Sequence, residues 1–386
     1  MTEYRFARAG EEADILDFIN LVFSQNARPH DFEKLLPKVY AHPGFAPLHA
    51  LALEEGRIRG AVAMLPVELR LQGAASPLRA GYIGSVSVHP KYRGRGFMKA
   101  LLRMQIDEAS RRDYDFLALG GQRQRYGYFG FEKCGVGVEF HVNAANVRHA
   151  LPPPAEAGQP GREFIFSQVE GGDGFALDFI ARLHESQPVS CLRPRKLLHD
   201  TLRTYGMTPY LIQDEVSGRP MGYLTAFDGD ISELALENKA LLPSVIRCWM
   251  AGRKSCSVYV PGFDQEALEA MQAFSESYAI RDSQLFSVLR WDRMLDSSLR
   301  FAAHVGRPLP QEKITVEIEN AGRVTLAHQA GQASAYFAPD AAPACRMTEK
   351  QAVQCFFSSF SALYPSFAPL RPWLPLPIDI PVADHF

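Results

Sequence analysis

The chain has 386 residues, of which 47% are hydrophobic and 22% charged, and its formal net charge at pH 7 is −2. This length exceeds what one hydrophobic core usually organises, so the sequence predicts two or three domains. A net charge near zero forces no face of the protein to be basic, which argues against a nucleic-acid partner.

Membrane, secretory and metal-binding signals are missing from the sequence. No run approaches the roughly 18 uninterrupted apolar residues of a membrane span, and the charged start from Met1 to Arg8 has no apolar signal core. The six cysteines are scattered without any Cys-x-x-Cys spacing, a pattern typical of reduced, buried thiols. The histidines are similarly dispersed. We therefore predict a cytoplasmic protein without a metal site.

The first 150 residues predict early helices, an antiparallel meander and then a β-α-β unit. Apolar residues recur at helical spacing in two early segments, and alternating strand-like segments follow around Gly-containing turns. The elements expected before the β-α-β unit are a strand at 4–7, helices at 15–23 and 32–40, and strands at 49–54, 58–67 and 68–71.

The stretch from Gly84 to Gly130 carries the strongest functional signal. An apolar β-branched run, Val86 to Val88, stops at Pro90, which has no N–H to continue a central strand. Two glycines separated by one arginine, Gly94 to Gly96, come next, and an amphipathic helical pattern begins after them.

A strand, a glycine-rich turn and a helix form the geometry of a phosphate cradle. Glycines let the backbone approach a ligand, and the first N–H groups and the dipole of the helix favour an anion. The stretch lacks the Gly-Lys-Ser/Thr of the mononucleotide loop and the three glycines of the dinucleotide fingerprint. It therefore predicts another kind of polyanionic phosphate site, the alternative being a basic turn before an ordinary helix. Four cations lie within nine residues: Lys91, Arg93, Arg95 and Lys99.

This loop resembles the acetyl-CoA pyrophosphate loop of the GNAT acyltransferases, whose pattern is Arg or Gln, two residues, Gly, one residue, then Gly or Ala. Arg93 and Gly96 fill the first two fixed positions, whereas Met98 departs from the third. A larger residue there is similar to the enhanced-intracellular-survival (Eis) type of acetyltransferase. The later motif Tyr126-Gly-x-Phe-Gly-Phe131 also resembles that type. The resemblance implies an N-acetyltransferase that uses acetyl-CoA as co-substrate.

The resemblance also implies how the co-substrate is held. Backbone groups of the strand before the loop would bind the pantetheine arm between two splayed strands, and the loop amides would bind the pyrophosphate. The cations of the loop either contact the outer phosphates or are solvated. The co-substrate-binding residues expected on this basis are Val86, Ser87, Val88, Arg93, Gly94, Arg95, Gly96, Phe97, Met98, Lys99, Gly121 and Gln122.

Transfer of an acetyl group from a thioester to an amine requires a base near the amine and an acid near the sulfur. In the Eis type, the acid is the tyrosine that opens the second motif, and the base is the α-carboxylate of a terminal phenylalanine. This sequence has Tyr126 at the first place and ends in Phe386. A free α-carboxylate has a reference pKa near 3.5 and is charged at pH 7. The alternatives are that Tyr126 is core and that Phe386 is a frayed end.

The rest of the chain predicts two further domains and an α/β (α+β) fold class overall. Residues 151–162 have a linker composition and separate a first domain at 1–150 from a second at 163–291. The second repeats the order of elements of the first, but Glu237-Asn238-Lys239-Ala240 stands where the glycine loop would be, so we interpret it as a degenerate GNAT-like domain.

Residues 292–386 resemble the sterol-carrier-protein-like domain that closes Eis-type chains. A helix is expected at 348–364, capped by Thr348. The proline-rich tail at 365–386 predicts an extended strap laid over a surface. Resemblance to the Eis type further implies a homo-oligomer, either a trimer or a hexamer.

The acyl acceptor implied by the resemblance is a primary amine: an aminoglycoside, a polyamine or a lysine side chain. Candidate residues for a cation pocket are Phe23, Asp31, Phe32 and Asp384, although such residues are often ordinary helix surface or core. The alternative function is a non-catalytic binding or scaffold protein that uses the C-terminal lipid-carrier-like domain.

Overall fold

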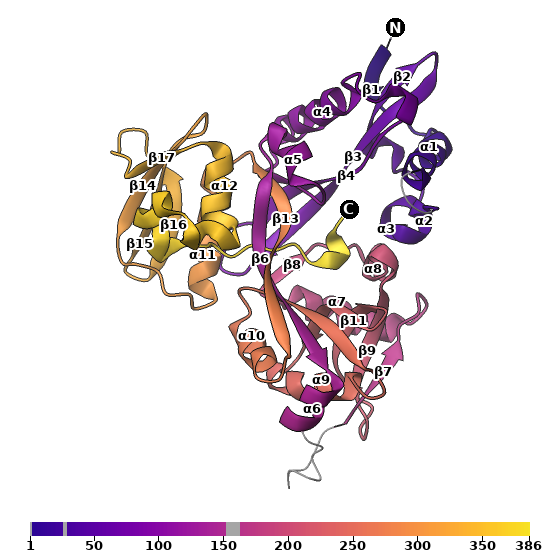
Figure 1. Ribbon diagram of the computed structural model, residues 1–386, viewed down its shortest axis with the longest axis vertical. Coiled ribbons are helices and arrows are strands. Elements are labelled where there is room, and N and C mark those ends of the chain that lie inside the picture. The colour runs from indigo at the N-terminus through magenta and orange to yellow at the C-terminus, as the bar shows by residue number, and fades with distance from the viewer. Residues whose placement is uncertain (1, 26–28, 152–162) are drawn as a thin grey trace.

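The computed structural model describes residues 2–25, 29–151 and 163–386, and Figure 1 shows three lobes that meet near the C-terminus. The mixed α/β class expected from the sequence is confirmed. The linker predicted at 151–162 lies outside the described residues, apart from Leu151. In the described part of the chain, no helix is both long and apolar enough to cross a membrane.

The first segment builds the upper lobe of Figure 1, except that its last helix, Ala144–Ala150, lies in the lower lobe. The helix predicted at 32–40 is wrong in one respect: Leu36 adopts φ −134° and ψ 60° before Pro37, so two short helices form. The strands predicted at 58–67 and 68–71 are one continuous strand. The elements are β1 (Thr2–Phe6), α1 (Glu12–Ser24), α2 (Phe32–Leu35), α3 (Pro37–Tyr40), β2 (His49–Glu54), β3 (Arg57–Leu71), β4 (Leu78–Val88), α4 (Phe97–Arg111), β5 (Phe116–Leu119), α5 (Arg123–Tyr126), β6 (Glu132–Asn143) and α6 (Ala144–Ala150).

The second segment builds the lower lobe. Its elements are β7 (Phe164–Gln168), α7 (Gly174–Glu185), β8 (Val189–Cys191), α8 (Leu198–Leu202), β9 (Thr208–Asp214), β10 (Pro220–Phe227), β11 (Asp230–Leu236), α9 (Leu242–Trp249), β12 (Ser255–Pro261), α10 (Gln265–Gln272) and β13 (Ser277–Val288). The sequence predicts helices at 175–185 and 241–250, and α7 and α9 begin and end within one residue of these ranges.

Two long strands join these lobes into one sheet, whose order in the described residues is β1-β2-β3-β4-β5-β13-β6-β12-β11-β10-β9-β7. Strands β6 and β13 pair antiparallel along most of their length, from Glu132 opposite Phe286 to His141 opposite Ser277. The end of β13 also pairs with β5 of the upper lobe, and the end of β6 pairs with β12 of the lower lobe. Figure 1 shows both strands running between the lobes. The division at 1–150 and 163–291 stays a prediction, but the sheet itself is continuous.

The third segment forms the lobe at the left of Figure 1, with a smaller sheet in the order β16-β15-β14-β17. The helix predicted at 348–364 ends at Phe357, although its start is confirmed by a capping box between Thr348 and Gln351. The elements are α11 (Trp291–His304), β14 (Lys313–Ile318), β15 (Gly322–Gln329), β16 (Gln332–Phe337), β17 (Cys345–Met347) and α12 (Glu349–Phe357).

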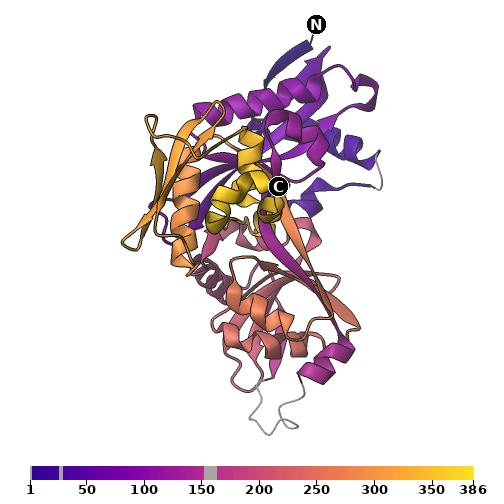
Figure 2. The ribbon, with the colours of Figure 1, turned by 60° about the vertical axis from the view of Figure 1, so that its left-hand side comes forward.

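The C-terminal strap, residues 365–386, passes from the third lobe to the junction of the other two, as Figure 2 shows. Its first part was expected to be extended but winds as 3-10 turns, η8 (Pro365–Trp373). The last residue of η8 and the extended residues that follow bury their apolar side chains, since Trp373, Leu376, Ile378 and Ile380 are each at most 1% exposed. Burial of one such side chain stabilises a fold by roughly 1.5–3 kcal/mol. The strap is therefore part of the core, which opposes fraying of the C-terminus.

Asp379, in the strap, predicts a specific pH dependence of stability. Its side chain is buried, and this burial raises the pKa of Asp379 to about 7. An unfolded aspartate releases its proton near pH 3.9, so between these values the folded state binds more protons. The stability contributed by Asp379 is therefore fully present below about pH 4 and falls as the pH rises to about 7.

We expect Asp379→Asn to remove this fall. Between pH 5 and pH 8, the variant should gain about 3 kcal/mol in free energy of unfolding relative to the unmodified protein. Urea unfolding at the two pH values measures this difference. Parallel pH profiles for the two proteins would show that Asp379 does not hold its proton in the folded state.

Candidate active site

A gap between strands β4 and β5 lies at the centre of the first lobe. The two strands pair in parallel from Ala80 to Ile83 on β4, after which β4 continues to Val88 without β5. At Ser85 the backbone turns to φ 49°, and the register with β3 shifts at this point, so β4 bends at a bulge. The splayed strands implied by the GNAT resemblance are therefore present, and the edge of β4 from Ser85 to Val88 faces the gap.

The glycine loop follows β4 and leads into α4. Gly94 has φ 78°, and Gly96 has φ 83° at the N-cap of α4, both in the left-handed region that favours glycine. An added Cβ at either glycine would meet no atom within 4 Å, so the space beside the loop is open. Because α4 is 15 residues long, its N-terminal N–H groups and dipole make this open space favourable for an anion.

One cavity of about 970 Å³ joins the loop, the strand gap and the C-terminus. It contains most of the residues that the sequence singled out. Those that line it are Phe23, Phe32, Val86, Ser87, Val88, Arg93, Gly94, Gly96, Phe97, Met98, Lys99, Gly121, Gln122, Tyr126 and Phe386.

Three predicted site residues do not line this cavity. Arg95 turns away from it and forms an ion pair with Glu54, with its Nη1 donating to Glu54 Oε2 at 3.0 Å. Asp31 caps α2 by accepting the N–H of Lys34. Asp384 is buried against Arg193. Local sequence placed these three side chains near the site, but Arg95 is paired with a carboxylate, Asp31 with a helix end and Asp384 with a cation elsewhere.

Tyr126 stands at the end of α5, on the cavity wall. Its ring packs so closely on Gly121 that a Cβ added there would approach its Cε2 atom to 2.7 Å, and it meets the ring of Phe131 edge-on at 6.4 Å. Burial raises the pKa of the Tyr126 hydroxyl above its usual value near 10, although Arg125 opposes the shift. The hydroxyl therefore keeps its proton at neutral pH, which suits a general acid.

Phe386 ends the chain inside the cavity. Its ring is 6% exposed and packs on β4 where Gly84 leaves room, because a Cβ at Gly84 would meet the ring at 2.7 Å. On another side it lies 6.1 Å from the ring of Tyr40. The Tyr40 hydroxyl is in turn hydrogen-bonded to Ser85 Oγ at 2.6 Å. The terminal residue is thus seated beside the bulge of β4.

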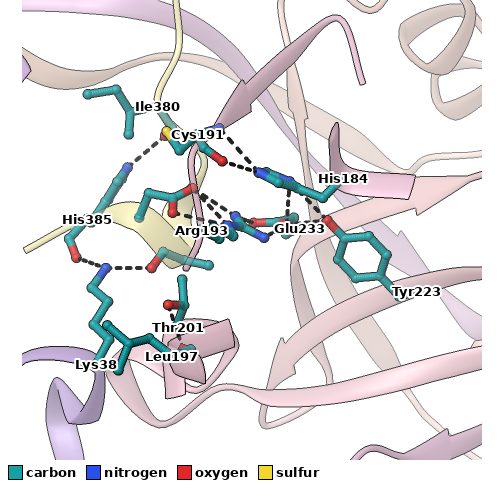
Figure 3. A network of polar contacts seen from close by, with 12 residues as sticks. Lys38, His184, Cys191, Arg193, Leu197, Thr201, Tyr223, Glu233, Ile380 and His385 are labelled. Carbon is teal, nitrogen blue, oxygen red and sulfur yellow. Dashed lines mark hydrogen bonds and ion pairs between the residues drawn. The ribbon is translucent and has the colours of Figure 1, made fainter. Parts of the chain in front are cut away.

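Lys38 fixes the backbone just before the terminal residue (Figure 3). Its Nζ donates to the carbonyl oxygens of Ala383 and His385, each at 2.6 Å. The His385 ring is hydrogen-bonded to the Ile380 carbonyl at 2.9 Å. Burial lowers the pKa of Lys38 to about 8. A helix near the start of the chain therefore positions its last peptide.

Arg193 forms the centre of the buried network in Figure 3. Its guanidinium donates to Glu233 Oε1 at 2.9 Å and to Asp384 Oδ2 at 2.8 Å, and its side chain is only 3% exposed. Tyr223 donates to Glu233 at 2.6 Å. Burial opposes ionisation of Asp384, but Arg193 outweighs it and lowers the pKa of Asp384 to about 2. Together with Lys38, the network balances two cations against two carboxylates.

Sequence reasoning missed several residues of this site. Tyr205 reaches the cavity from the second segment, in a left-handed turn at φ 61°, and burial raises its pKa to about 12. His30, Leu35 and Leu36 line the cavity beside Phe32. Gly206 follows Tyr205 in the sequence, but nothing in the local sequence indicated that this turn meets the first lobe.

The first segment of the chain matches a known protein family. Residues 3–134, about a third of the chain, match the family model of the acetyltransferase (GNAT) domain. The chain therefore carries a GNAT acetyltransferase domain, and the prediction of an acyltransferase enzyme is confirmed at this level. None of the curated proteins matches the sequence.

Several solved structures are similar to the whole chain, and each covers 100% of this chain and of its own. A probable N-acyltransferase from Enterococcus faecalis has 15% sequence identity and a TM-score of 0.69. A GCN5-related N-acetyltransferase from Anabaena variabilis has 16% identity and a TM-score of 0.70. Eis1 from Mycobacterium abscessus has 13% identity and a TM-score of 0.63. At these identities the likeness shows the shared fold.

Proposed function

We propose that this protein is an acetyl-CoA-dependent N-acetyltransferase that moves an acetyl group to a primary amine by direct attack. The observation that carries the proposal is the single cavity that joins the loop at Gly94 to Lys99, the hydroxyl-bearing wall at Tyr126 and the terminal Phe386. An anion cradle, an acid and a base are the groups that this reaction needs, and the candidate residues for all three line this cavity.

The residues around the loop fit a phosphate-bearing co-substrate. The open space beside Gly94 and Gly96, the N-terminus of α4 and the cations Arg93 and Lys99 suit a pyrophosphate. The β4 edge from Ser85 to Val88 would hold an extended amide-bearing arm by backbone hydrogen bonds. Acetyl-CoA, when bound, supplies the acyl group as a thioester.

The proposed acid and base are Tyr126 and the α-carboxylate of Phe386. As the amine nitrogen forms its bond to the acyl carbon, the carboxylate takes the proton that the nitrogen loses. As the carbon–sulfur bond breaks, the Tyr126 hydroxyl gives its proton to the sulfur. The products are an amide and a free thiol, and the proton passes back from the carboxylate to the phenolate through solvent.

The remaining proposals concern architecture. We propose that the second segment is a GNAT-like domain that has lost its co-substrate site, because Lys239 Nζ binds Asp264 Oδ2 at 2.6 Å where the corresponding loop would lie. A sterol-carrier-like third domain, a homo-oligomeric state and a cytoplasmic location stay predictions from the sequence. So does the scaffold alternative, which rests on the likeness of the third domain to lipid carriers.

Calorimetry with acetyl-CoA, followed by a thiol-release assay, tests the proposed function. We expect binding of acetyl-CoA and release of thiol that depends on an added amine, with aminoglycosides, polyamines, lysine peptides, arylalkylamines and alkylamines as acceptors. Failure to bind acetyl-CoA would overturn the proposal in favour of the scaffold alternative. Binding without amine-dependent release would overturn the assignment of amines as acceptors.

A further inference from the structure

The cavity crosses the sheet from one face to the other. Helix α4 packs on one face of β2 and β3, with Ala50, Ala52 and Val62 in its core cluster, whereas α1 packs on the opposite face with Leu51 and Ala61. Successive residues of a strand point to opposite faces, so these two helices cover different sides. The phosphate cradle lies at α4, and the acceptor must therefore approach from the side of α1 and α2.

The wall on that side is aromatic and apolar. The ring of Phe23 meets that of Phe32 edge-on at 4.9 Å and that of His30 at 5.4 Å. Leu35 continues this wall on α2, and Tyr205 adds a third phenyl ring from the second lobe. Such a set of rings suits a planar aromatic or apolar group.

The charges of the cavity are distributed unevenly. Its charged side chains among the described residues are the cations Arg93, Lys99 and Arg125, and no aspartate or glutamate of those residues lines it. The two acids expected to attract a cation, Asp31 and Asp384, are engaged by Lys34 and Arg193. The proposed base, the α-carboxylate of Phe386, is therefore the anion that the proposed function leaves to compensate an ammonium group.

We propose that the acceptor is an amine with one cationic centre and an aryl or apolar body, such as an arylalkylamine, and not a polycation. This inference rests on the proposed acetyltransferase function. One carboxylate can compensate one ammonium group, whereas each further ammonium of a polyamine or aminoglycoside would lose its hydration without a partner. An apolar surrounding also favours the neutral form of the amine, which is the nucleophile.

The test compares acceptor classes with the full-length protein and acetyl-CoA at fixed ionic strength. We expect kcat/KM for 2-phenylethylamine to exceed that for spermidine and for kanamycin at least about 100-fold. Each ammonium group that enters the cavity without a partner should lower kcat/KM by about two or more powers of ten. Equal or higher kcat/KM for the polycations would overturn the inference and leave the proposed function intact. No release with any amine would overturn the proposed function and, with it, this inference.

A charge placed in the aromatic wall provides a second test. Phe23→Asp should lower kcat/KM for 2-phenylethylamine and raise it for spermidine, so that the ratio of the first value to the second falls at least about tenfold. The affinity for acetyl-CoA, measured by calorimetry, should be unchanged. The matched control is Phe175→Asp on the exposed face of α7, where the ring is 65% exposed. The ratio should be unchanged in this control. A ratio that stays constant in Phe23→Asp, with acetyl-CoA still bound, would contradict the placement of the acceptor against α1.

Discussion

Replacement of Tyr126 by phenylalanine is expected to lower kcat by about 10² to 10⁴, because general acid catalysis contributes a factor of this size. The phenyl ring keeps the packing on Gly121 and Phe131, and it removes only the hydroxyl that would protonate the leaving sulfur. Affinity for acetyl-CoA, measured by calorimetry, should change little. Thiol release at saturating acceptor measures the effect.

A matched tyrosine elsewhere in the sheet controls for this change. Tyr278 on β13 is 54% exposed and does not line the cavity, so Tyr278→Phe should leave kcat unchanged. The assignment of Tyr126 as the acid fails if Tyr126→Phe retains full turnover. It also fails if the loss appears in the affinity for acetyl-CoA and not in kcat.

Removal of the buried cation Arg193 should cause the largest loss of stability. Arg193→Met leaves Glu233 and Asp384 buried with only Lys38 to balance their charge. Breaking a buried ion pair by removing one partner typically destabilises a protein by about 3–5 kcal/mol. We expect a loss of this size in the free energy of unfolding, measured in urea near pH 7.

The control for this prediction lies two residues along the chain. Arg195 pairs with Asp178 at 2.5 Å, but its side chain is 41% exposed, and exposed ion pairs contribute below about 1 kcal/mol. Arg195→Met should therefore have little effect. Similar losses in the two variants would mean that the charges around Arg193 are solvated in solution, and that the network does not hold the strap.

The features of the site that lie close together in sequence could be predicted. Residues close together in the sequence specify three of these features: the strand from Val86 to Val88, the two glycines of the loop and the helix that begins after Gly96. Their conformational preferences decide the local fold. Tyr126 and Phe386 could be named because a motif and a chain end mark them.

Features that depend on distant partners could not be predicted. Asp384 lies two residues from the C-terminus, at the end of the 3-10 turn η9 (Val382–Asp384). The side-chain carboxylate of Asp384 nevertheless pairs with Arg193, which is 191 residues away in the sequence. The contact of Lys38 with the His385 carbonyl spans 347 residues. A cation does not encode which distant acceptor it will meet, so such pairs follow only from the assembled fold.

The pairing of β6 and β13 across the first two lobes could not be predicted from the sequence for a similar reason. Strand β13 is exposed over its first five residues and buried over its last five, and nothing in its own sequence indicates which lobe buries the second half. Its insertion between β5 and β6 is decided by long-range pairing. The aromatic wall of the cavity likewise combines α1, α2 and the turn at Tyr205, which lies more than 160 residues further along the chain.

The position of the terminal carboxylate is the claim on which the account depends most directly. The test is to append one glycine after Phe386, which moves the carboxylate by one residue and leaves every side chain of the strap in place. With acetyl-CoA and the best acceptor amine, we predict that kcat falls at least about 100-fold, while the free energy of unfolding and the affinity for acetyl-CoA are retained. Full turnover by the extended protein would contradict the account, because the base would then be another group.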